Sequence, residues 1–330
     1  MTIRATAVAI TIGAAGAAAL VAPASTAHAQ AWPTRPILMV VPLQAGSAVD
    51  AMMRIVAQKM SENMGQQIVI ENQPGAAGLI GAERLARATP DGYTIAGLND
   101  GLLTMMPNLR EKIPYDPQKS FAPASQVAGI VWVMIVTPSL PVKSVREFVA
   151  LAKARPDEVN FSSGGNGSPQ HVAMELFKSL TGARLQHVPY RGATQAALDV
   201  VGGQVPVMFT ALSIVQGQVQ VGKVRALGVG GPKRSTLFPE VPTVEEAGVK
   251  GFRFGTWGAI AAPAGTPRDI VARLNAEIVK AVQSPDVRDR LTGQSLDPIG
   301  STPEQLAEII RIDLARMGHV IRTAGIRLDP

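Results

Sequence analysis

Short apolar runs alternate with segments of helical periodicity along this chain, and this alternation limits the possible fold more than any other feature. The run ILMVV at 37–41 is typical of a strand buried on both faces, and apolar residues then follow at helical spacing over 49–64. The next elements are predicted to be a strand, a helix and a strand at 67–71, 79–88 and 93–97. This order predicts parallel strands joined by right-handed crossovers.

The same alternation restarts after a proline-rich stretch, which we interpret as irregular and which contains Pro107, Pro114, Pro117 and Pro123. Strands are then predicted at 131–136, 160–162, 185–188 and 205–209, and helices at 144–154, 171–180 and 195–201. The tail has one apolar run, at 258–263, and two helical segments, at 267–282 and 302–324.

The segments before and after the proline-rich stretch are each predicted to form one α/β lobe. The tail is rich in helices and poor in strands, so we expect it to pack back on the first of these lobes. The predicted organisation is therefore two α/β lobes, each a mostly parallel sheet flanked by helices, with a hinge of two crossing segments. The first lobe takes 32–128 and 253–330, and the second lobe takes 129–252.

The first 31 residues differ from the rest of the chain. Arg4 precedes an Ala-rich apolar run, and the sequence Ala27-His28-Ala29 provides an A-x-A cleavage site. This pattern indicates a secretory signal peptide, since a membrane anchor needs about 20 strongly apolar residues. Cleavage near 29–31 would release the mature protein into the periplasm.

Composition excludes several classes of function. The chain has no cysteine, which excludes disulfides, thiolate metal sites and a lipidated N-terminal cysteine. Its net charge is +6, but Lys and Arg are scattered, so we expect no nucleic-acid partner. We also expect no cofactor and no metal, because GAAGLIG at 75–81 lacks the dinucleotide spacing and the histidines lack metal-ligand spacing. Asp50 and Glu71 could form an acid/base pair, although nothing in the sequence brings them together.

Three glycine-rich turns follow predicted strands and precede predicted helices, at 42–47, 72–78 and 162–168. Small residues let a ligand approach the backbone, and free N–H groups at helix starts favour an anion. Each turn could equally serve only as a tight connection. Asp50 is expected to brace the first turn from the helix that follows it, and His171 could either face the cleft or cap its helix locally.

Many motifs over the whole mature chain resemble one family. They include Trp32-Pro-x-Arg-Pro36, Val41-Pro-x-x-Ala-Gly46, Glu71-Asn72-x-Pro-Gly-Ala76, Pro90-Asp-Gly-Tyr-Thr94, Ser162-Ser-Gly164, Asn166-Gly-Ser168, Val188-Pro-Tyr-Arg-Gly192, Gly202-Gly-Gln204 and Ala262-Pro-Ala-Gly-Thr-Pro267. The chain resembles the substrate-binding proteins of tripartite tricarboxylate transporters, the Bug family. The resemblance implies a Venus-flytrap periplasmic-binding-protein fold that closes on a carboxylate.

Carried over to this chain, the resemblance places ligand contacts mainly in the first turn and in the turn of the second lobe. The expected ligand-binding residues are Leu43, Gln44, Ala45, Gly46, Ser47, Ala76, Ser163, Gly164, Gly165, Asn166, Gly167, Ser168, His171 and Thr210. Ser47, Pro206 and Thr210 depart from the family pattern. The loss of an aspartate at the last two positions favours a plain mono- or dicarboxylate over an amino acid.

The expected function is that of a monomeric, non-enzymatic carrier that delivers a small organic anion to the membrane permease subunits of a tripartite transporter. An exported ligand sensor without its own permease is the alternative. A secreted enzyme is a further alternative, for which the sequence offers no recognisable catalytic set.

Overall fold

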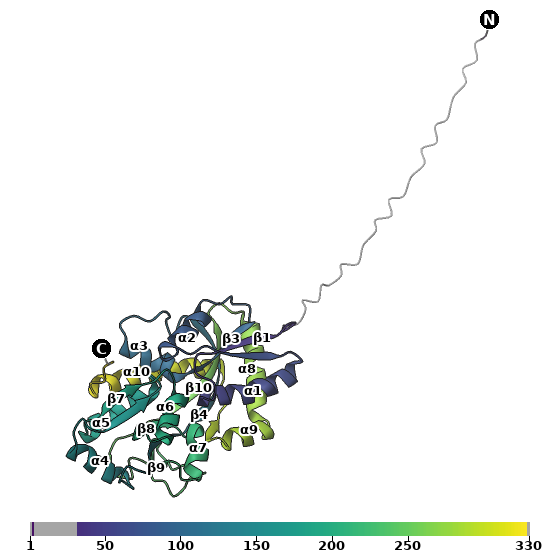
Figure 1. Cartoon of the computed structure of the whole chain (residues 1–330). Helices are drawn as coiled ribbons and strands as arrows, with labels where there is room; N and C mark the ends of the chain where they lie inside the picture. The colour runs from purple at the N-terminus through teal and green to yellow at the C-terminus, as the bar shows by residue number, and fades with distance from the viewer. Residues whose placement is uncertain (1, 3–31, 329–330) are drawn as a thin grey trace. The chain divides into compact units, whose positions relative to one another are not determined.

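The computed structural model describes Thr2 and residues 32–328. The predicted signal peptide and its cleavage site therefore lie, apart from Thr2, outside the described residues. Pro33–Pro330 form one compact unit, within which two sheets stand apart, each with its own helices (Figure 1). None of the helices in the described part of the chain has both the length and the hydropathy that crossing a membrane requires.

Lobe 1 contains a six-stranded sheet whose strands come from both ends of the compact unit. The strand order is β11-β4-β10-β3-β1-β2. The bounds are β1 Ile37–Val41, β2 Ile68–Asn72, β3 Thr94–Asn99, β4 Phe121–Ile130, β10 Thr256–Pro263 and β11 Leu296–Pro298. Since β10 lies between β3 and β4, the C-terminal part of the chain completes the sheet that the N-terminal part begins.

Lobe 2 contains a five-stranded sheet built from the middle of the chain, in the order β7-β6-β8-β5-β9. The bounds are β5 Trp132–Val136, β6 Asn160–Ser163, β7 Gln186–Pro189, β8 Val207–Ala211 and β9 Arg225–Val229. The two sheets, with the helices packed on them, confirm the prediction of a two-lobed α/β fold.

The chain crosses between the lobes at two places. Val131 alone separates β4 from β5, and the return path enters β10 at Thr256. The Trp132 Nε1 donates a hydrogen bond of 2.7 Å to the Thr256 Oγ1, so the two crossings are joined to each other. The predicted boundaries at 128/129 and 252/253 lie close to these crossings and stay predictions.

Both sheets are more mixed than the sequence predicts. β1 pairs with β2 and β3 in parallel, and β6 pairs with β7 and β8 in parallel. The strands next to the crossings run the other way: β10 is antiparallel to β3 and β4, and β5 is antiparallel to β8 and β9. The reason is that β10 enters its sheet from the opposite lobe, whereas the parallel strands are joined by helices within one lobe.

The interpretation of 107–123 as irregular was wrong at both ends. Pro107 lies in the first turn of the short helix α3 (Met106–Leu109), where its missing N–H costs no helical hydrogen bond. Pro123 lies inside β4, beside a register shift in the pairing with β10. Such irregularities tolerate a proline that a regular central strand would not.

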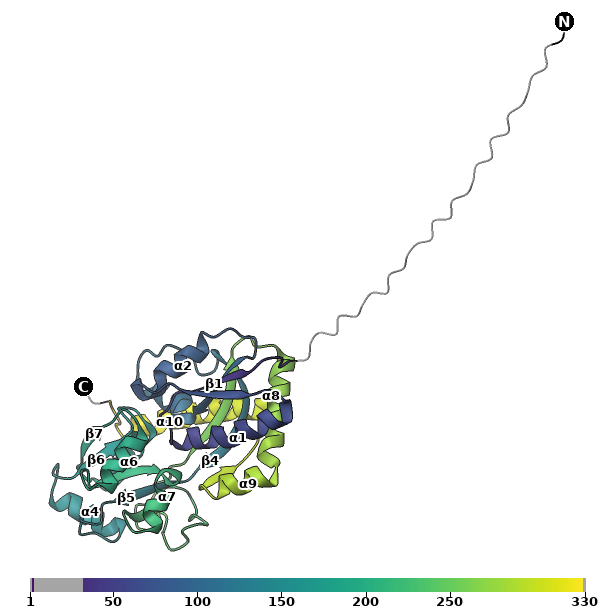
Figure 2. The same ribbon diagram turned by 45° about the vertical axis from the view of Figure 1, so that its right-hand side comes forward.

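Ten α-helices are described, and they cover the sheets of the two lobes. Their bounds are α1 Ala48–Met64, α2 Leu79–Ala86, α3 Met106–Leu109, α4 Val145–Ala154, α5 Pro169–Thr181, α6 Ala193–Val201, α7 Leu212–Gln220, α8 Arg268–Gln283, α9 Pro285–Thr292 and α10 Pro303–Thr323. A 3-10 turn at Ala76–Gly78 and a π-helical turn at Gly101–Met105 precede α2 and α3. In Figures 1 and 2, α8 and α9 lie beside α1, and α4 lies at the far end of lobe 2.

Helix α1 is fixed by methionines that pack onto glycines of the lobe 1 sheet. A Cβ atom at Gly97 would lie 2.4 Å from the Met53 Cγ, and one at Gly258 would lie 2.6 Å from the Met52 Sδ. Both methionines are fully buried, and α1 ends at Gly65 in the left-handed conformation, as the periodicity predicts. This packing sets where the N-terminus of α1 lies.

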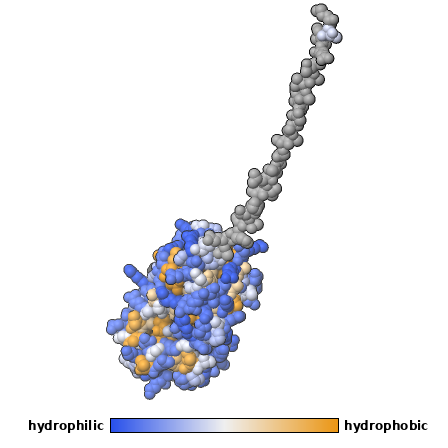
Figure 3. Space-filling view, turned by 90° about the vertical axis from the view of Figure 1, so that its right-hand side faces the viewer, coloured by the Kyte–Doolittle hydropathy of each residue, from blue (hydrophilic) through white to orange (hydrophobic). Residues whose placement is uncertain are grey.

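On the surface, Figure 3 shows only scattered apolar patches among hydrophilic residues on the face in view.

Candidate functional site

The N-termini of five helices meet at a cleft between the lobes. It is a small cavity of about 60 Å³, lined by residues of both lobes. The lining includes the first residues or N-caps of α1, α2, α5, α6 and α7, represented by Ala48, Gly78, Pro169, Ala193 and Ala211. Helix N-termini carry partial positive charge and N–H groups without intrahelical acceptors. The cleft therefore has the electrostatic character of an anion site.

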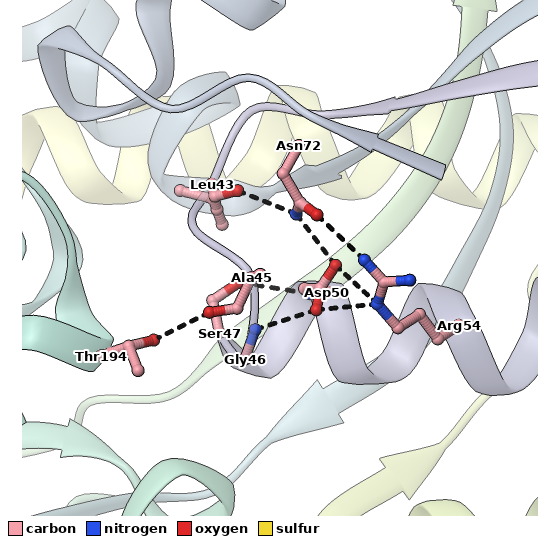
Figure 4. A network of polar contacts seen from close by, with 8 residues as sticks. All are labelled: Leu43, Ala45, Gly46, Ser47, Asp50, Arg54, Asn72 and Thr194. Atoms are coloured by element: carbon pink, nitrogen blue, oxygen red, sulfur yellow. Dashed lines mark hydrogen bonds and ion pairs between the residues drawn. The ribbon is translucent and has the colours of Figure 1, made fainter. Parts of the chain in front are cut away.

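The lobe 1 turn is held by Asp50, which is 3% exposed (Figure 4). Its carboxylate accepts hydrogen bonds from the Gly46 N–H at 2.9 Å and from the Asn72 Nδ2 at 2.9 Å. The Arg54 Nε donates to both carboxylate oxygens at 3.1 and 3.0 Å. Asn72 also donates to the Leu43 carbonyl at 3.0 Å, which ties the turn to the end of β2. Asp50 and Asn72 therefore connect the turn to the first turn of α1 and to the end of β2.

The same contacts set the ionisation of Asp50. Burial raises the pKa of this carboxyl, but the hydrogen bonds from Arg54, Gly46 and Asn72 outweigh burial and lower the pKa below its ordinary value. Asp50 is therefore charged at neutral pH. Glu71 forms its own ion pair with Arg84, so the two carboxylates belong to separate networks rather than to an acid/base pair.

The lobe 2 turn is held by two stacked histidines. The His171 Nδ1 accepts a hydrogen bond of 3.2 Å from the Gly167 N–H, and the ring stacks on His187 with centroids 4.2 Å apart. The His187 Nε2 lies 2.6 Å from the Ser163 Oγ, and the Phe161 ring stacks with the rings of His187 at 4.8 Å and His171 at 6.4 Å between centroids. Of the two alternatives left open for His171, the structure shows local bracing of the turn.

Ser163 and His187 could suggest a nucleophile and its base. Ser163 is fully buried and is not among the residues that line the cleft. Its Oγ also accepts the Gly165 N–H at 3.1 Å, as a turn-bracing hydroxyl does. No three His, Asp or Glu side chains gather as a possible metal site within the residues that the structure describes.

The structure separates the predicted site residues into three groups. Those that line the cleft are Leu43, Gln44, Ser47, Gly164 and Ser168. Those that line a neighbouring cavity are Gln44 again, Ala76, Gly165 and Asn166. Those that line neither are Ala45, Gly46, Ser163, Gly167, His171 and Thr210.

For two members of the third group, Gly46 and Thr210, their surroundings explain why they are not positioned to contact a ligand in the cleft. The Gly46 N–H is already bonded to Asp50, so it is not available to a ligand. Thr210 is fully buried in β8, and it is the next residue, Ala211, that reaches the cleft. Thr210 does not line the cleft, so its departure from the family pattern gives no direct support for a plain carboxylate.

Several lining residues were not predicted from the sequence. Among the residues that the structure describes, Arg191 is the only charged one that lines the cleft, and it immediately precedes Gly192 and Ala193 at the start of α6. Asn99 lines the cleft from the end of β3, and Gln170 lines it from the first turn of α5. A usable signal existed for Arg191, because it follows a predicted strand and belongs to the Val188–Gly192 motif.

The lobes touch each other beside the cleft. The Thr194 Oγ1 of α6 donates to the Ala45 carbonyl at 3.4 Å, as Figure 4 shows. A Cβ atom at Gly192 would lie 2.2 Å from the Gln44 side chain, so these residues of opposite lobes are also in contact. The described arrangement is thus a closed one, with the turns of both lobes facing one small cavity.

Comparison with known proteins identifies the family. The sequence model of the tripartite tricarboxylate transporter family receptor matches residues 52–326. The chain belongs to this family. Protein BugT of Bordetella pertussis is 35% identical over 306 residues, which cover 92% of this chain and 94% of BugT.

Two solved structures extend the comparison. One is an R. palustris protein with adipate, which is 33% identical with a TM-score of 0.87 over 90% of this chain and 99% of that one. The other is MatC from Rhodopseudomonas palustris with bound malate, which is 32% identical with a TM-score of 0.84 over 88% of this chain and all of that one, 100%. The predicted resemblance to the Bug family is confirmed.

Proposed function

We propose that this receptor is a periplasmic carrier that captures a small carboxylate between its lobes and delivers it to a tripartite-type permease. The observation that carries the proposal is the convergence of five helix N-termini from both lobes on a cleft whose single charged lining residue, within the described part of the chain, is a cation, Arg191. No carboxylate among the described residues lines that cleft to repel an anion.

The contacts for a carboxylate follow from the local geometry. Ala48 and Val49 begin α1 and Gln170 lies in the first turn of α5, so their N–H groups have no intrahelical acceptor. The Ser47 and Ser168 hydroxyl oxygens accept from helix N–H groups, which leaves each O–H proton to donate into the cleft. Two lobes thus offer donors to one anion, and backbone donors of this kind hold anions well.

Closure is the second part of the proposal. An open form admits the anion, and the closed form is stabilised because donors of both lobes reach the anion only when the lobes meet. The joined crossings at Trp132 and Thr256 provide the pivot. Nothing in this cycle requires bond-making chemistry, in keeping with a receptor.

The relatives support the choice of ligand class. Family members of similar fold have been solved with adipate and with malate, which are both dicarboxylates. The predicted signal peptide supports export to the periplasm.

The experiment is a thermal-shift screen of the mature protein against mono-, di- and tricarboxylates, followed by titration calorimetry on every acid that raises the melting temperature. A ligand that binds only the folded state stabilises it in proportion to RT ln(1 + [L]/Kd). Amino acids, sugars and inorganic phosphate serve as comparison ligands. A protein that responds to a sugar or an amino acid and to no carboxylate would refute the proposal.

A further inference from the structure

A second cavity adjoins the cleft. It measures about 550 Å³ and is lined from both lobes by Gln44, Pro74, Gly75, Ala76, Ala77, Arg110, Gly165, Asn166, Pro189, Tyr190 and Arg191. We call it the outer compartment. It shares Gln44, Pro74, Gly75, Ala77 and Arg191 with the cleft, so the two cavities have a common wall.

Among the described residues, the charged side chains that line the outer compartment are both positive. Arg110 contributes from lobe 1, just after α3, and Arg191 contributes from lobe 2, just before α6. No Asp or Glu lines the compartment among the described residues. Neither arginine side chain has a hydrogen bond or an ion pair to any residue in the described part of the chain, whereas Arg54 and Arg84 nearby each pair with a carboxylate.

Gln44 forms part of the wall between the two cavities. The Gln44 side chain from lobe 1 packs against the bare backbone of Gly192 from lobe 2. Gln44 is long, uncharged and only partly buried, so it can turn aside for a ligand that spans both cavities. Gly192 must stay free of a side chain for this packing, because its Cβ would collide with Gln44.

We propose that the outer compartment is a second anion subsite, in which Arg110 and Arg191 bind the distal carboxylate of a dicarboxylate held at the helix N-termini of the cleft. This inference rests on the proposed function and narrows its ligand class. Arginines from opposite lobes can both reach such a group only in the closed state, so the distal carboxylate also favours closure.

Arg110 provides the specific test, because it lines the outer compartment and not the cleft. The probes are linear dicarboxylates and monocarboxylates of equal length, from four to eight carbons, measured by titration calorimetry. We expect Arg110→Gln to weaken the best dicarboxylate by about 5- to 20-fold, as for one lost charge-assisted hydrogen bond. The matched monocarboxylate should change by less than about twofold. Arg110→Lys should restore part of the dicarboxylate affinity.

Arg146→Gln is the matched control. Arg146 is exposed on α4, at the far end of lobe 2, and its loss removes the same charge without touching either cavity. It should leave both ligand series unchanged. In addition, dicarboxylate affinity should fall more steeply with ionic strength in the wild type than in Arg110→Gln.

The outcomes separate the two proposals. If carboxylates bind but Arg110→Gln lowers both series equally or neither, the second subsite is refuted and the proposed function stands. If the wild type binds no acid of either series, the second subsite is refuted, and the proposed function fails with it only when no other carboxylate of the thermal-shift screen binds either.

Discussion

The first turns of α1 in lobe 1 and of α5 in lobe 2 both begin with Gly-Ser and have a hydrogen-bond acceptor three residues after the serine, but this acceptor is a different residue in each lobe. Lobe 1 has Gly46-Ser47-Ala-Val-Asp50, and lobe 2 has Gly167-Ser168-Pro-Gln-His171. Each serine caps its helix by accepting the backbone N–H of the last residue in its stretch, at 3.2 Å in lobe 1 and 3.4 Å in lobe 2.

The side chain of that last residue then reaches back to the N–H of the leading glycine. Asp50 accepts from Gly46 at 2.9 Å, and His171 accepts from Gly167 at 3.2 Å. Both glycines have positive φ, 75° and 83°, which is why glycine is required before the cap. The backbone geometry of the turn therefore needs an acceptor at this position, and either a charged carboxylate or an imidazole nitrogen can supply it.

The two acceptors differ in what surrounds them. Asp50 sits in a polar network with Arg54 and Asn72, so its brace is electrostatic. His171 sits in a stack with His187 and Phe161, so ring packing contributes to its brace together with the hydrogen bond from Gly167. Changes at the two positions should therefore have different sizes and different causes.

The largest effect is expected for Asp50→Ala. This change leaves the Gly46 N–H and the Asn72 amide without their acceptor and Arg54 without its partner. We expect a loss of about 3 kcal/mol in the free energy of unfolding, measured by urea denaturation. Asp286→Ala is the control, because Asp286 pairs with Lys59 on the surface and should cost less than about 0.5 kcal/mol. Equal losses in the two variants would contradict the bracing role.

A smaller loss is expected for His171→Phe, which keeps a ring in the stack but removes the acceptor of the Gly167 N–H. One buried N–H without a partner costs about 1–3 kcal/mol, and we expect about 2 kcal/mol in urea denaturation. His319→Gln, at an exposed position of α10, should have no measurable effect. A loss larger than that of Asp50→Ala would show that ring packing is not the main support of the lobe 2 turn.

The pH dependence of the melting temperature should reveal the contribution of the charged Asp50 side chain. Because the pKa of Asp50 is lowered in the folded state, its stabilising effect is complete above the unfolded pKa of about 4. This effect is lost as the pH falls through the folded pKa. The melting temperature of the wild type should therefore exceed that of Asp50→Asn by a constant amount above about pH 5, and the difference should shrink below about pH 4. Calorimetry between pH 2.5 and 7 tests this; a difference that disappears between pH 6 and 7 would point to another group.

The sequence predicted what depends on local patterns. The helical spacing before Gly65 placed α1, and the Asp50 position suggested a brace, because each depends on residues a few positions apart. β4 was missed because Pro123 breaks the strand pattern, and only the irregular pairing with β10, more than 130 residues later, accommodates it. Arg191 follows a predicted strand, so the sequence indicated the edge at which it lies, but its contact with the cleft depends on how the two lobes meet, which no local pattern encodes.

The smallest effects are expected for the serine N-caps, Ser47 and Ser168, which the two turns share. Ser47 and Ser168 adopt nearly the same backbone angles, φ −68° and ψ 159° against φ −65° and ψ 158°. Ser47→Ala and Ser168→Ala should therefore each lower the free energy of unfolding by about 1 kcal/mol, the usual cost of a lost N-cap. Urea denaturation of both variants, with exposed Ser139→Ala as the control, measures the two costs side by side. Equal costs would place the difference between the lobes at Asp50 and His171 alone, whereas costs that differ by more than about 1 kcal/mol would show that the caps themselves are not equivalent.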